Sequence, residues 1–268
     1  MAEVLRLAAG DVRAVVLPED GGRLGSVVVA GQELLVTQGM GPMQWGSYPM
    51  VPWAGRIRRG RFRFDGREHV LPQGMPPHAI HGVAYDRPWR IDGPAQISIE
   101  LDDRWPFGGR ARQRFVLDEE GLEVVMTVEA DEEMPVTIGW HPWFRRRLAG
   151  SDEPAVLRFS ARSMLLRDGD GMPDGRLVPP TPGPWDDVFT GVGDGPELEW
   201  PGRIRLALSS TCAWWVVYSE PEHAICVEPQ SGPPDAVNLG SVRPDLAPSI
   251  VRPGVPLEHS MRWRWTRL

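Results

Sequence analysis

Lysine is absent from this chain of 268 residues, so all 29 of its basic side chains are arginine. This absence excludes enzymes whose chemistry needs a lysine amine, among them pyridoxal enzymes, Schiff-base aldolases and nucleotide hydrolases with a P-loop lysine. Cysteine is scarce as well, because Cys212 and Cys226 are the only two. A chain of this length needs no disulfide framework to be stable, so we expect both thiols to be free and buried.

Several common functional signatures are also missing. The sequence has no Gly-x-Ser-x-Gly, no Gly-x-Gly-x-x-Gly after a strand, no Cys-x-x-Cys and no His-Glu-x-x-His, which argues against hydrolase triads, dinucleotide binding and zincins. No uninterrupted apolar run approaches the roughly 20 residues that span a bilayer. A net charge of −7 gives no general attraction for nucleic acids or anionic membranes. The sequence therefore predicts no nucleic-acid and no membrane partner, and we expect a cytoplasmic protein.

The pattern that is present has a period of two. Apolar and polar side chains alternate in residues 61–64, 96–101, 122–128 and 261–265, as they do in half-buried strands. No stretch of a dozen residues carries the apolar stripe of an amphipathic helix free of proline and glycine, so any helices must be short. The sequence predicts an all-β protein.

Turn signals divide the chain into short strands. Asp65-Gly66 predicts a hairpin between two alternating segments, because glycine accepts a positive φ, and residues 118–121 predict a second one. Residues 168–184 are polar and rich in proline and glycine, which predicts an extended loop. Neither a break in composition nor an internal repeat divides the chain. We therefore expect one domain over residues 1–268, built as a large antiparallel β-sandwich.

Histidine is the side chain whose ordinary pKa lies nearest neutrality, so each of the six is a candidate for acid–base chemistry. His78 and His81 are three residues apart beside proline and glycine. Metal binding there would need a third ligand that the neighbourhood lacks, so we predict no metal site. His69, His223 and His259 lie in charged or strand-like surroundings, which predicts surface positions.

His141 and Glu228 stand out because each lies in an apolar context. His141 is surrounded by aromatic residues in the segment 139–144, and two interpretations fit: a packed aromatic core, or a sugar pocket in which tryptophan faces stack on pyranose rings. Glu228 follows an apolar run and precedes Pro229, which predicts a carboxylate at the end of a buried strand, pointing into a cleft. The alternative for Glu228 is a solvated loop acid, but the strand before it lacks polar alternation.

Four short motifs occur in order along nearly the whole chain: Gly55-Arg56-Ile57-x-x-Gly60-x-Phe62, Ile80-His81-Gly82, His141-Pro142-Trp143-Phe144 and Glu228-Pro229-Gln230. Together they resemble the aldose 1-epimerase (galactose mutarotase) family. The resemblance implies a β-supersandwich fold and interconversion of the α and β anomers of a free aldose, a hexose such as glucose or galactose. It implies no cofactor. It leaves the identity of the sugar open, and the choice between monomer and homodimer.

The resemblance also implies an acid and a base. Glu228 would take the proton of the anomeric hydroxyl as the base, and His141 would protonate the ring oxygen as the acid, with the roles exchanged on ring closure. Arg56 and His81 would hold oxygen atoms of the sugar and stabilise charge that develops on them.

Further site residues and two departures follow from the same comparison. Asp186 resembles the sugar-binding aspartate of the family, with Asp187 as the alternative by one residue, and Gln230 is counted with the substrate-binding residues. Gly55 stands where the family commonly has asparagine, which removes an amide that could orient the following arginine. Val83 stands where a second glycine often follows the histidine, which predicts a narrower pocket.

Three other functions stay open on the sequence. A 1-epimerase for hexose 6-phosphates could use the four arginines of residues 56–61 as phosphate ligands, although a solvated arginine face on a strand explains them as well. A non-catalytic sugar-binding protein of the same fold is the second, and the joint presence of Glu228 and His141 argues against it. Glycoside hydrolysis is the third, and it needs another carboxylate opposite Glu228, for which Asp186 is the candidate.

Overall fold

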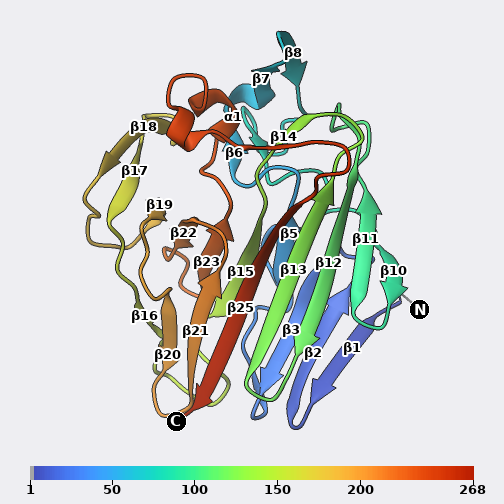
Figure 1. Ribbon diagram of the computed structural model, residues 1–268. Coiled ribbons are helices and arrows are strands. Elements are labelled where there is room, and N and C mark those ends of the chain that lie inside the picture. The colour runs from blue at the N-terminus through green and yellow to red at the C-terminus, as the bar shows by residue number, and fades with distance from the viewer. Residues whose placement is uncertain (1–2) are drawn as a thin grey trace.

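The computed structural model describes residues 3–268 and contains two large antiparallel sheets (Figure 1). The larger sheet has eleven strands, in the spatial order β1 (Leu5–Ala9), β2 (Val12–Leu17), β3 (Arg23–Val29), β5 (Ser47–Met50), β15 (Gly139–Arg145), β23 (Ala224–Gln230), β22 (Trp214–Tyr218), β19 (Asp186–Thr190), β17 (Ser163–Arg167) and β18 (Pro173–Val178), with β4 (Gln32–Glu33) paired to β3. The smaller sheet has eight, in the order β10 (Arg90–Gly93), β11 (Gln96–Glu100), β12 (Arg110–Leu117), β13 (Gly121–Glu129), β25 (Leu257–Arg267), β21 (Ile204–Ser210), β20 (Glu197–Trp200) and β16 (Val156–Arg158). The predicted all-β sandwich is confirmed.

Small ladders and short helical turns make up the remaining elements. The ladders are β6 (Arg56–Ile57) with β9 (Ala79–Ile80), β7 (Arg61–Phe64) with β8 (Arg67–Val70), and β14 (Met134–Val136) with β24 (Ser249–Val251). The helical turns are α1 (Ala236–Leu239), η1 (Arg58–Gly60) and η2 (Pro244–Leu246), as short as the sequence predicts. Within residues 3–268, no helix has the length and apolarity that crossing a membrane requires.

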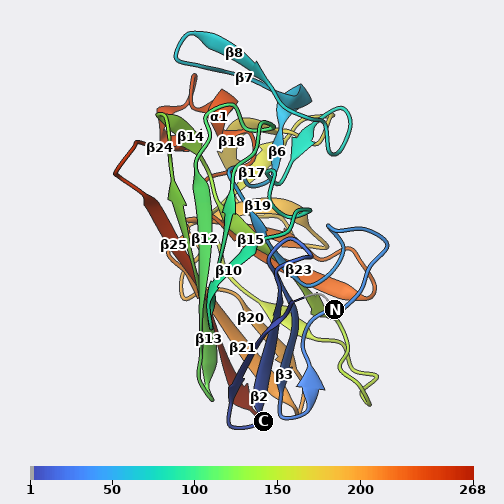
Figure 2. The same ribbon diagram turned by 90° about the vertical axis from the view of Figure 1, so that its right-hand side faces the viewer.

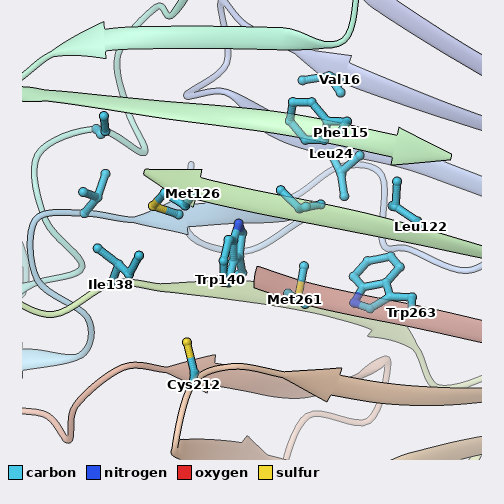
Figure 3. Close-up of a cluster of buried hydrophobic side chains, with 14 of the residues drawn as sticks. Val16, Leu24, Phe115, Leu122, Met126, Ile138, Trp140, Cys212, Met261 and Trp263 are labelled. Carbon is cyan, nitrogen blue, oxygen red and sulfur yellow. The ribbon is translucent and has the colours of Figure 1, made fainter. Parts of the chain in front are cut away.

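The main hydrophobic core lies between the two sheets, which form two layers in the view turned by 90° (Figure 2). Trp140 of β15 and Trp263 of β25 are buried here, among Phe115, Met126 and Met261 (Figure 3). The Trp140 indole nitrogen donates a 3.1 Å hydrogen bond to the Gln113 side chain, so its polar atom is satisfied inside the core. Truncating a tryptophan packed in this way would cost about 3–5 kcal/mol of unfolding free energy.

Strand β15 is buried on both faces, and this places the site. Successive side chains of a strand point to opposite faces. Trp140 and Phe144 enter the core between the sheets, where the Phe144 ring lies 4.9 Å from that of Trp263. His141 and Trp143 therefore point to the other face of the larger sheet, away from the second layer.

Both predicted hairpins are confirmed. Asp65 and Gly66 connect β7 to β8 with φ of 47° and 73°, and this hairpin projects from one end of the sandwich (Figures 1 and 2). In the second hairpin, the Asp118 amide donates to the Gly121 carbonyl at 3.0 Å between β12 and β13. Turn residues that accept or stabilise the required backbone angles make such loops readable from sequence.

The predicted loop over residues 168–184 is wrong in part, because it contains strand β18. The strand begins at Pro173 and includes Gly175, residues that rarely occur within a sheet. β18 is the edge strand of the larger sheet, where a missing proline N–H breaks no ladder on the outer side.

The two thiols and the outlying histidines lie mostly where the sequence predicts. Cys212 and Cys226 are free and buried, as predicted. His223 is exposed, whereas His69 and His259 are half-buried, so the surface prediction holds fully for His223 alone.

Candidate active site

The six residues that the sequence predicts for the catalytic pair and the substrate site all line one cavity of about 290 Å³. The cavity lies over the face of the larger sheet that points away from the second layer. Side chains of six neighbouring strands form its floor, and loops and small ladders form its walls. The residues predicted for it are Arg56, His81, His141, Asp186, Glu228 and Gln230.

The first row of the floor is a cross-strand series over five strands. Tyr48 is paired with His141, and the register that pairs Gly139 with Gln230 and Trp143 with Cys226 places His141 opposite Glu228. Glu228 is paired with Val216, and Val216 with Val188. Directly opposed residues share one face of a sheet, so these side chains all face the cavity: Tyr48, His141, Glu228, Val216 and Val188.

A second row lies two residues along the same strands. It pairs Trp143 with Cys226, Cys226 with Tyr218, and Tyr218 with Asp186. Cys226 is covered, whereas Trp143, Tyr218 and Asp186 line the cavity. Two rows of a rigid sheet thus bring together groups as far apart in sequence as Tyr48 and Glu228.

Glu228 lies inside a strand and not at its end, which corrects the prediction. β23 continues through Pro229 to Gln230. The ladder between β15 and β23 is interrupted between Gly139 and Trp143, the stretch that contains Pro142 and faces Pro229. Proline cannot donate to a ladder, so the interruption lets both prolines lie within interior strands.

The predicted acid and base contact each other in this stretch. The His141 Nε2 atom lies 3.2 Å from Glu228 Oε1, and the Gln230 side-chain amide donates to Glu228 Oε2 at 3.2 Å. Exposure is only 6% for His141 and 2% for Glu228. Burial raises the pKa of Glu228 well above its ordinary value, and the charge of Asp186 adds to this rise.

Burial acts on the pKa of His141 in the opposite direction. It lowers the pKa well below the ordinary imidazole value, because a charged ring is poorly solvated here, and His81 adds to the effect. A base whose pKa is raised holds a proton more strongly, and an acid whose pKa is lowered gives one up more readily. Both shifts strengthen the two proton transfers of such a pair, and they place its single proton on Glu228 at rest, so the reactive form is the one in which that proton has moved to His141.

Aromatic rings surround the His141 imidazole. The Tyr48 ring stacks on it with centroids 4.8 Å apart, and the His81 ring meets it edge-on at 5.3 Å. Trp143 is stacked between His141 at 5.4 Å and His223 at 5.9 Å. Trp143 also lines the cavity, and the stacking of a tryptophan face on a sugar ring stays a prediction.

The two interpretations of the segment 139–144 are each right for half of its aromatic residues. Trp140 and Phe144 are packed core, as the aromatic-core interpretation predicts. His141 and Trp143 line the cavity, as the pocket interpretation predicts. Alternation along one strand produces both outcomes.

The wall opposite this pair carries Arg56 and His81. Arg56 is paired with Ile80 across the β6–β9 ladder, and the His81 amide donates to the Gly55 carbonyl at 2.9 Å. Gly82 follows at φ 81°, and a Cβ there would lie 1.9 Å from the Val51 carbonyl oxygen. The glycine after His81 is therefore required by the backbone.

Burial lowers the pKa of His81 to about 3, and the Arg56 guanidinium contributes to this drop. His81 is consequently neutral at physiological pH and can donate or accept a hydrogen bond but not supply charge. Arg56 itself makes no ion pair with another residue of the described chain 3–268.

The two departures at Gly55 and Val83 have different outcomes. A Cβ at Gly55, whose φ is 69°, would lie 2.6 Å from Pro234, so the 233–235 turn fills the space of the missing amide, and Arg56 still reaches the cavity. Val83 does not line the cavity, and its buried side chain belongs to the main core. The prediction that Val83 narrows the pocket is therefore wrong.

Asp186, and not Asp187, lines the cavity. Arg167 binds both carboxylates, through Nη1 to Asp186 Oδ2 at 2.9 Å and through Nε to Asp187 Oδ1 at 3.2 Å. Burial raises the pKa of Asp186, an effect that the charges of Arg167 and Arg56 oppose.

Arg167 and Tyr48 are cavity residues that the sequence did not identify. Arg167 belongs to no motif, and its signal would have been a charged residue at the end of the apolar segment 164–166. Tyr48 could have been found only from its pairing with His141. The segment 168–184 also contributes, because Gly171, Met172 and Pro173 line the cavity.

The arginine cluster does not converge on the cavity. Arg56 alone of the four lines it. Arg58 lies 2.7 Å from Asp168, 3.8 Å from Asp170 and 3.7 Å from Asp235, and it thereby ties the β17–β18 turn to α1. Arg59 and Arg61 are exposed, as the solvated-face interpretation predicts, but only Arg61 lies on a strand, because Arg59 belongs to η1. Among residues 3–268, no cluster of three or more histidine, cysteine, aspartate or glutamate side chains is placed to hold a metal.

A family model described as aldose 1-epimerase matches residues 3–193. The chain belongs to the aldose 1-epimerase family. The resemblance to this family is thereby confirmed, and three of the four motifs lie within the matched residues. Glu228 and Gln230 lie beyond the matched residues, and it is the pairing of β15 with β23 that brings Glu228 to His141 in this family member.

Relatives of this epimerase-family chain cover most of its length. An uncharacterised Escherichia coli K12 protein, YihR, is 26% identical over 275 residues, which is 89% of this chain and 87% of YihR. The galactose mutarotase of Mus musculus is 23% identical over 271 residues, 80% of this chain and 76% of that enzyme. The crystal structure of a galactose mutarotase-like protein from Clostridium acetobutylicum has a TM-score of 0.85 at 17% identity, covering 98% and 95% of the two chains. The shared fold is that of galactose mutarotase-like proteins.

Proposed function

We propose that this protein is an aldose 1-epimerase that interconverts the α and β anomers of a free aldose. One observation carries the proposal: Glu228 and His141 form a 3.2 Å pair at the floor of a cavity whose walls carry Arg56, His81 and Asp186. Binding alone does not require an acid and a base in contact, so the pair argues against a site that only binds sugar. The family membership of the chain supports the same reaction class, because the family consists of isomerases.

In the proposed reaction, Glu228 takes the proton from the anomeric hydroxyl while His141 protonates the ring oxygen and the bond from C1 to that oxygen breaks. The open-chain aldehyde rotates about C1–C2. The hydroxyl then attacks the other face of the carbonyl, returning its proton to His141, while Glu228 protonates the former carbonyl oxygen. The pair ends with the proton count it began with, so the reaction needs no oxidant, reductant or cofactor.

The polar character of the walls supports a polyhydroxylated ligand. Nine buried side-chain polar atoms within residues 3–268 have no hydrogen-bond partner in the chain, and five of them belong to residues that line this cavity. Native proteins leave few buried polar groups unpaired, so this concentration supports a cavity that takes a polar ligand. The five atoms are Tyr48 Oη, His81 Nδ1, His141 Nδ1, Trp143 Nε1 and Gln230 Oε1.

We also propose that residues 1–268 act as one domain. The main core draws on residues from Leu5 to Trp265, and the cavity walls on residues from Met43 to Pro234. A single cooperative unfolding transition is expected, and two separate transitions would contradict it.

Polarimetry tests the proposed reaction. Freshly dissolved α-D-glucose, α-D-galactose and glucose 6-phosphate are followed with the wild-type protein, with Glu228→Gln and with the exposed control Glu222→Gln. We expect the wild type and the control to accelerate mutarotation of at least one sugar, and Glu228→Gln to lose roughly 10²-fold or more of that acceleration while still binding sugar. Full acceleration by Glu228→Gln would contradict the proposal, and release of nitrophenol from aryl glycosides would favour hydrolysis instead.

A further inference from the structure

Arg167 is the cavity arginine that the acid–base mechanism does not use. It is the last residue of β17, and the register that pairs Ser163 with Thr190 and Leu165 with Val188 places it opposite Asp186 on β19. Opposite charges in such a position attract across the ladder. Arg167 thus extends the second row of the cavity floor by one strand.

The guanidinium is anchored at both ends. Nη1 binds Asp186, which lines the cavity, and Nε binds Asp187, which does not. Adjacent strand residues point to opposite faces, so Asp187 holds Arg167 from the side away from the sugar. A planar guanidinium with two fixed partners has little freedom to rotate, and it fixes the orientation of the Asp186 carboxylate.

Asp186 needs such support because its surroundings favour the uncharged acid. It is partly buried, and its own negative charge acts on Glu228 across the cavity. An uncharged Asp186 would accept hydrogen bonds from sugar hydroxyls only weakly, whereas an ionised carboxylate accepts them strongly. The titratable and charged groups that act on Asp186, or on which it acts, are Arg167, Arg56, Asp187, Glu228, Tyr218 and Cys226.

We propose that Arg167 is a positioning residue, which keeps the Asp186 carboxylate oriented and ionised as the acceptor for hydroxyl groups of the aldose. This inference rests on the proposed epimerase function and names a determinant of its substrate binding. Arg167 acts through Asp186, so its removal weakens sugar binding and leaves proton transfer between Glu228, His141 and the sugar largely intact.

The test compares Arg167→Gln with the matched control Arg205→Gln. Arg205 lies on the other sheet, does not line the cavity, and also binds two carboxylates, Glu197 at 3.4 Å and Glu199 at 2.9 Å. For Arg167→Gln we expect KM to rise about tenfold or more, and kcat to stay within about threefold of the wild type. For Arg205→Gln we expect no change in either constant.

Two further readouts separate positioning from mere structural support. Without Arg167, Asp186 takes up a proton more readily, so sugar affinity, measured as 1/KM, weakens with acid at a higher pH than in the wild type. Arg167→Lys keeps the positive charge, but an ammonium group cannot bind Asp186 and Asp187 together as the planar guanidinium does. We expect this variant to bind the aldose more tightly than Arg167→Gln and less tightly than the wild type. Asp187→Asn removes the rear anchor alone, and we expect a smaller rise in KM in the same direction.

The outcomes are distinct from those of the Glu228 experiment. Unchanged KM and an unmoved pH profile in Arg167→Gln, with turnover lost in Glu228→Gln, would overturn the role of Arg167 and leave the epimerase standing. If Arg167→Gln does not fold, Asp187→Asn decides: a normal KM there overturns the inference. A wild-type protein that neither turns over nor binds the tested aldoses, with binding followed by tryptophan fluorescence, would overturn both proposals.

Discussion

Tyr48 stacks on His141 across the β5–β15 ladder, with ring centroids 4.8 Å apart and ring planes 25° from parallel. The contact covers one face of the imidazole and holds it at the distance at which its Nε2 atom meets Glu228. The Tyr48 hydroxyl is buried and has no partner within residues 3–268. The ring and the hydroxyl can therefore be tested separately.

For Tyr48→Leu, we expect kcat to fall about tenfold, because the imidazole loses its stacking partner and its fixed orientation. For Tyr48→Phe, we expect turnover close to wild type and an unfolding free energy about 1 kcal/mol higher, because a buried unpaired hydroxyl is removed. Steady-state kinetics and denaturant unfolding measure both effects. Loss of turnover in Tyr48→Phe would instead assign the hydroxyl a contact with the sugar.

His141→Asn tests whether the imidazole serves chemistry or packing. We expect mutarotation to slow by roughly 10²-fold or more, because asparagine fills similar space but cannot transfer the proton. Thermal unfolding should remain cooperative, since the core side of β15 carries Trp140 and Phe144 and is untouched. A collapse of cooperative unfolding would show that His141 is primarily a packing residue.

The pH dependence of turnover should report the reversed order of the pair. Burial raises the pKa of Glu228 and lowers the pKa of His141, so the form with one proton on the pair spans the range between them. The acid side of the kcat/KM profile then belongs to imidazole and the basic side to carboxyl, as apparent values of a coupled pair.

The temperature dependence of the pH profile shows which of its two sides belongs to His141 and which to Glu228. Imidazole ionisation has a much larger enthalpy than carboxyl ionisation, so we expect the acid side of the profile to move on heating and the basic side to stay in place. The opposite behaviour would mean that Glu228 titrates below His141, in the ordinary order. Profiles at two temperatures are sufficient.

Protonation of His81 should limit stability in acid. Folding lowers the pKa of His81 to about 3. Below pH 6.5 the unfolded chain therefore binds a proton at His81 that the folded chain does not bind. The contribution of His81 to the free energy of unfolding is greatest above pH 6.5 and is lost as the pH falls toward 3. Between pH 7 and pH 4 the free energy of unfolding decreases by roughly 3 kcal/mol for this reason. Denaturant unfolding of His81→Gln should lose much of this dependence. The exposed His223→Gln is the control, and an equal effect in both variants would refute the assignment.

Gly82→Ala should damage both stability and affinity. The new Cβ would lie 1.9 Å from the Val51 carbonyl oxygen at a φ of 81°, so the backbone that presents His81 must move. We expect a loss of roughly 3 kcal/mol or more in unfolding free energy. Gly66→Ala is the control, because Gly66 has a similar φ of 73° and nothing within 4 Å, so only the strain of about 1 kcal/mol applies. Equal losses in the two variants would show that the contact with Val51 is unimportant.

Local patterns of the fold were predictable, and pairings between distant strands were not. The alternation in residues 261–265 and the Asp65-Gly66 turn are local signals, and both are confirmed in the structure. β18 was missed because proline and glycine in an edge strand look like a loop. The partners of each strand depend on contacts between residues far apart in sequence, which composition and period do not encode.

The same distinction applies to the site. The four motifs identified Glu228 and His141, but their contact depends on the register of β15 with β23. Arg167 was invisible because its partner lies across a ladder on another strand. The prediction that Val83 narrows the pocket was wrong because its side chain belongs to the main core. Only His81 of the segment 81–83 lines the cavity.

The alternation of β15 also limits how this gene can change during evolution. Successive side chains of the strand belong to opposite compartments. An insertion or deletion of a single codon between Gly139 and Arg145 would therefore exchange the compartments of the residues on one side of it, so that cavity residues enter the core and core residues enter the cavity. Loops at either end can gain or lose codons without this exchange. Length variation among descendants of this chain should therefore accumulate in its loops and spare β15 and β23.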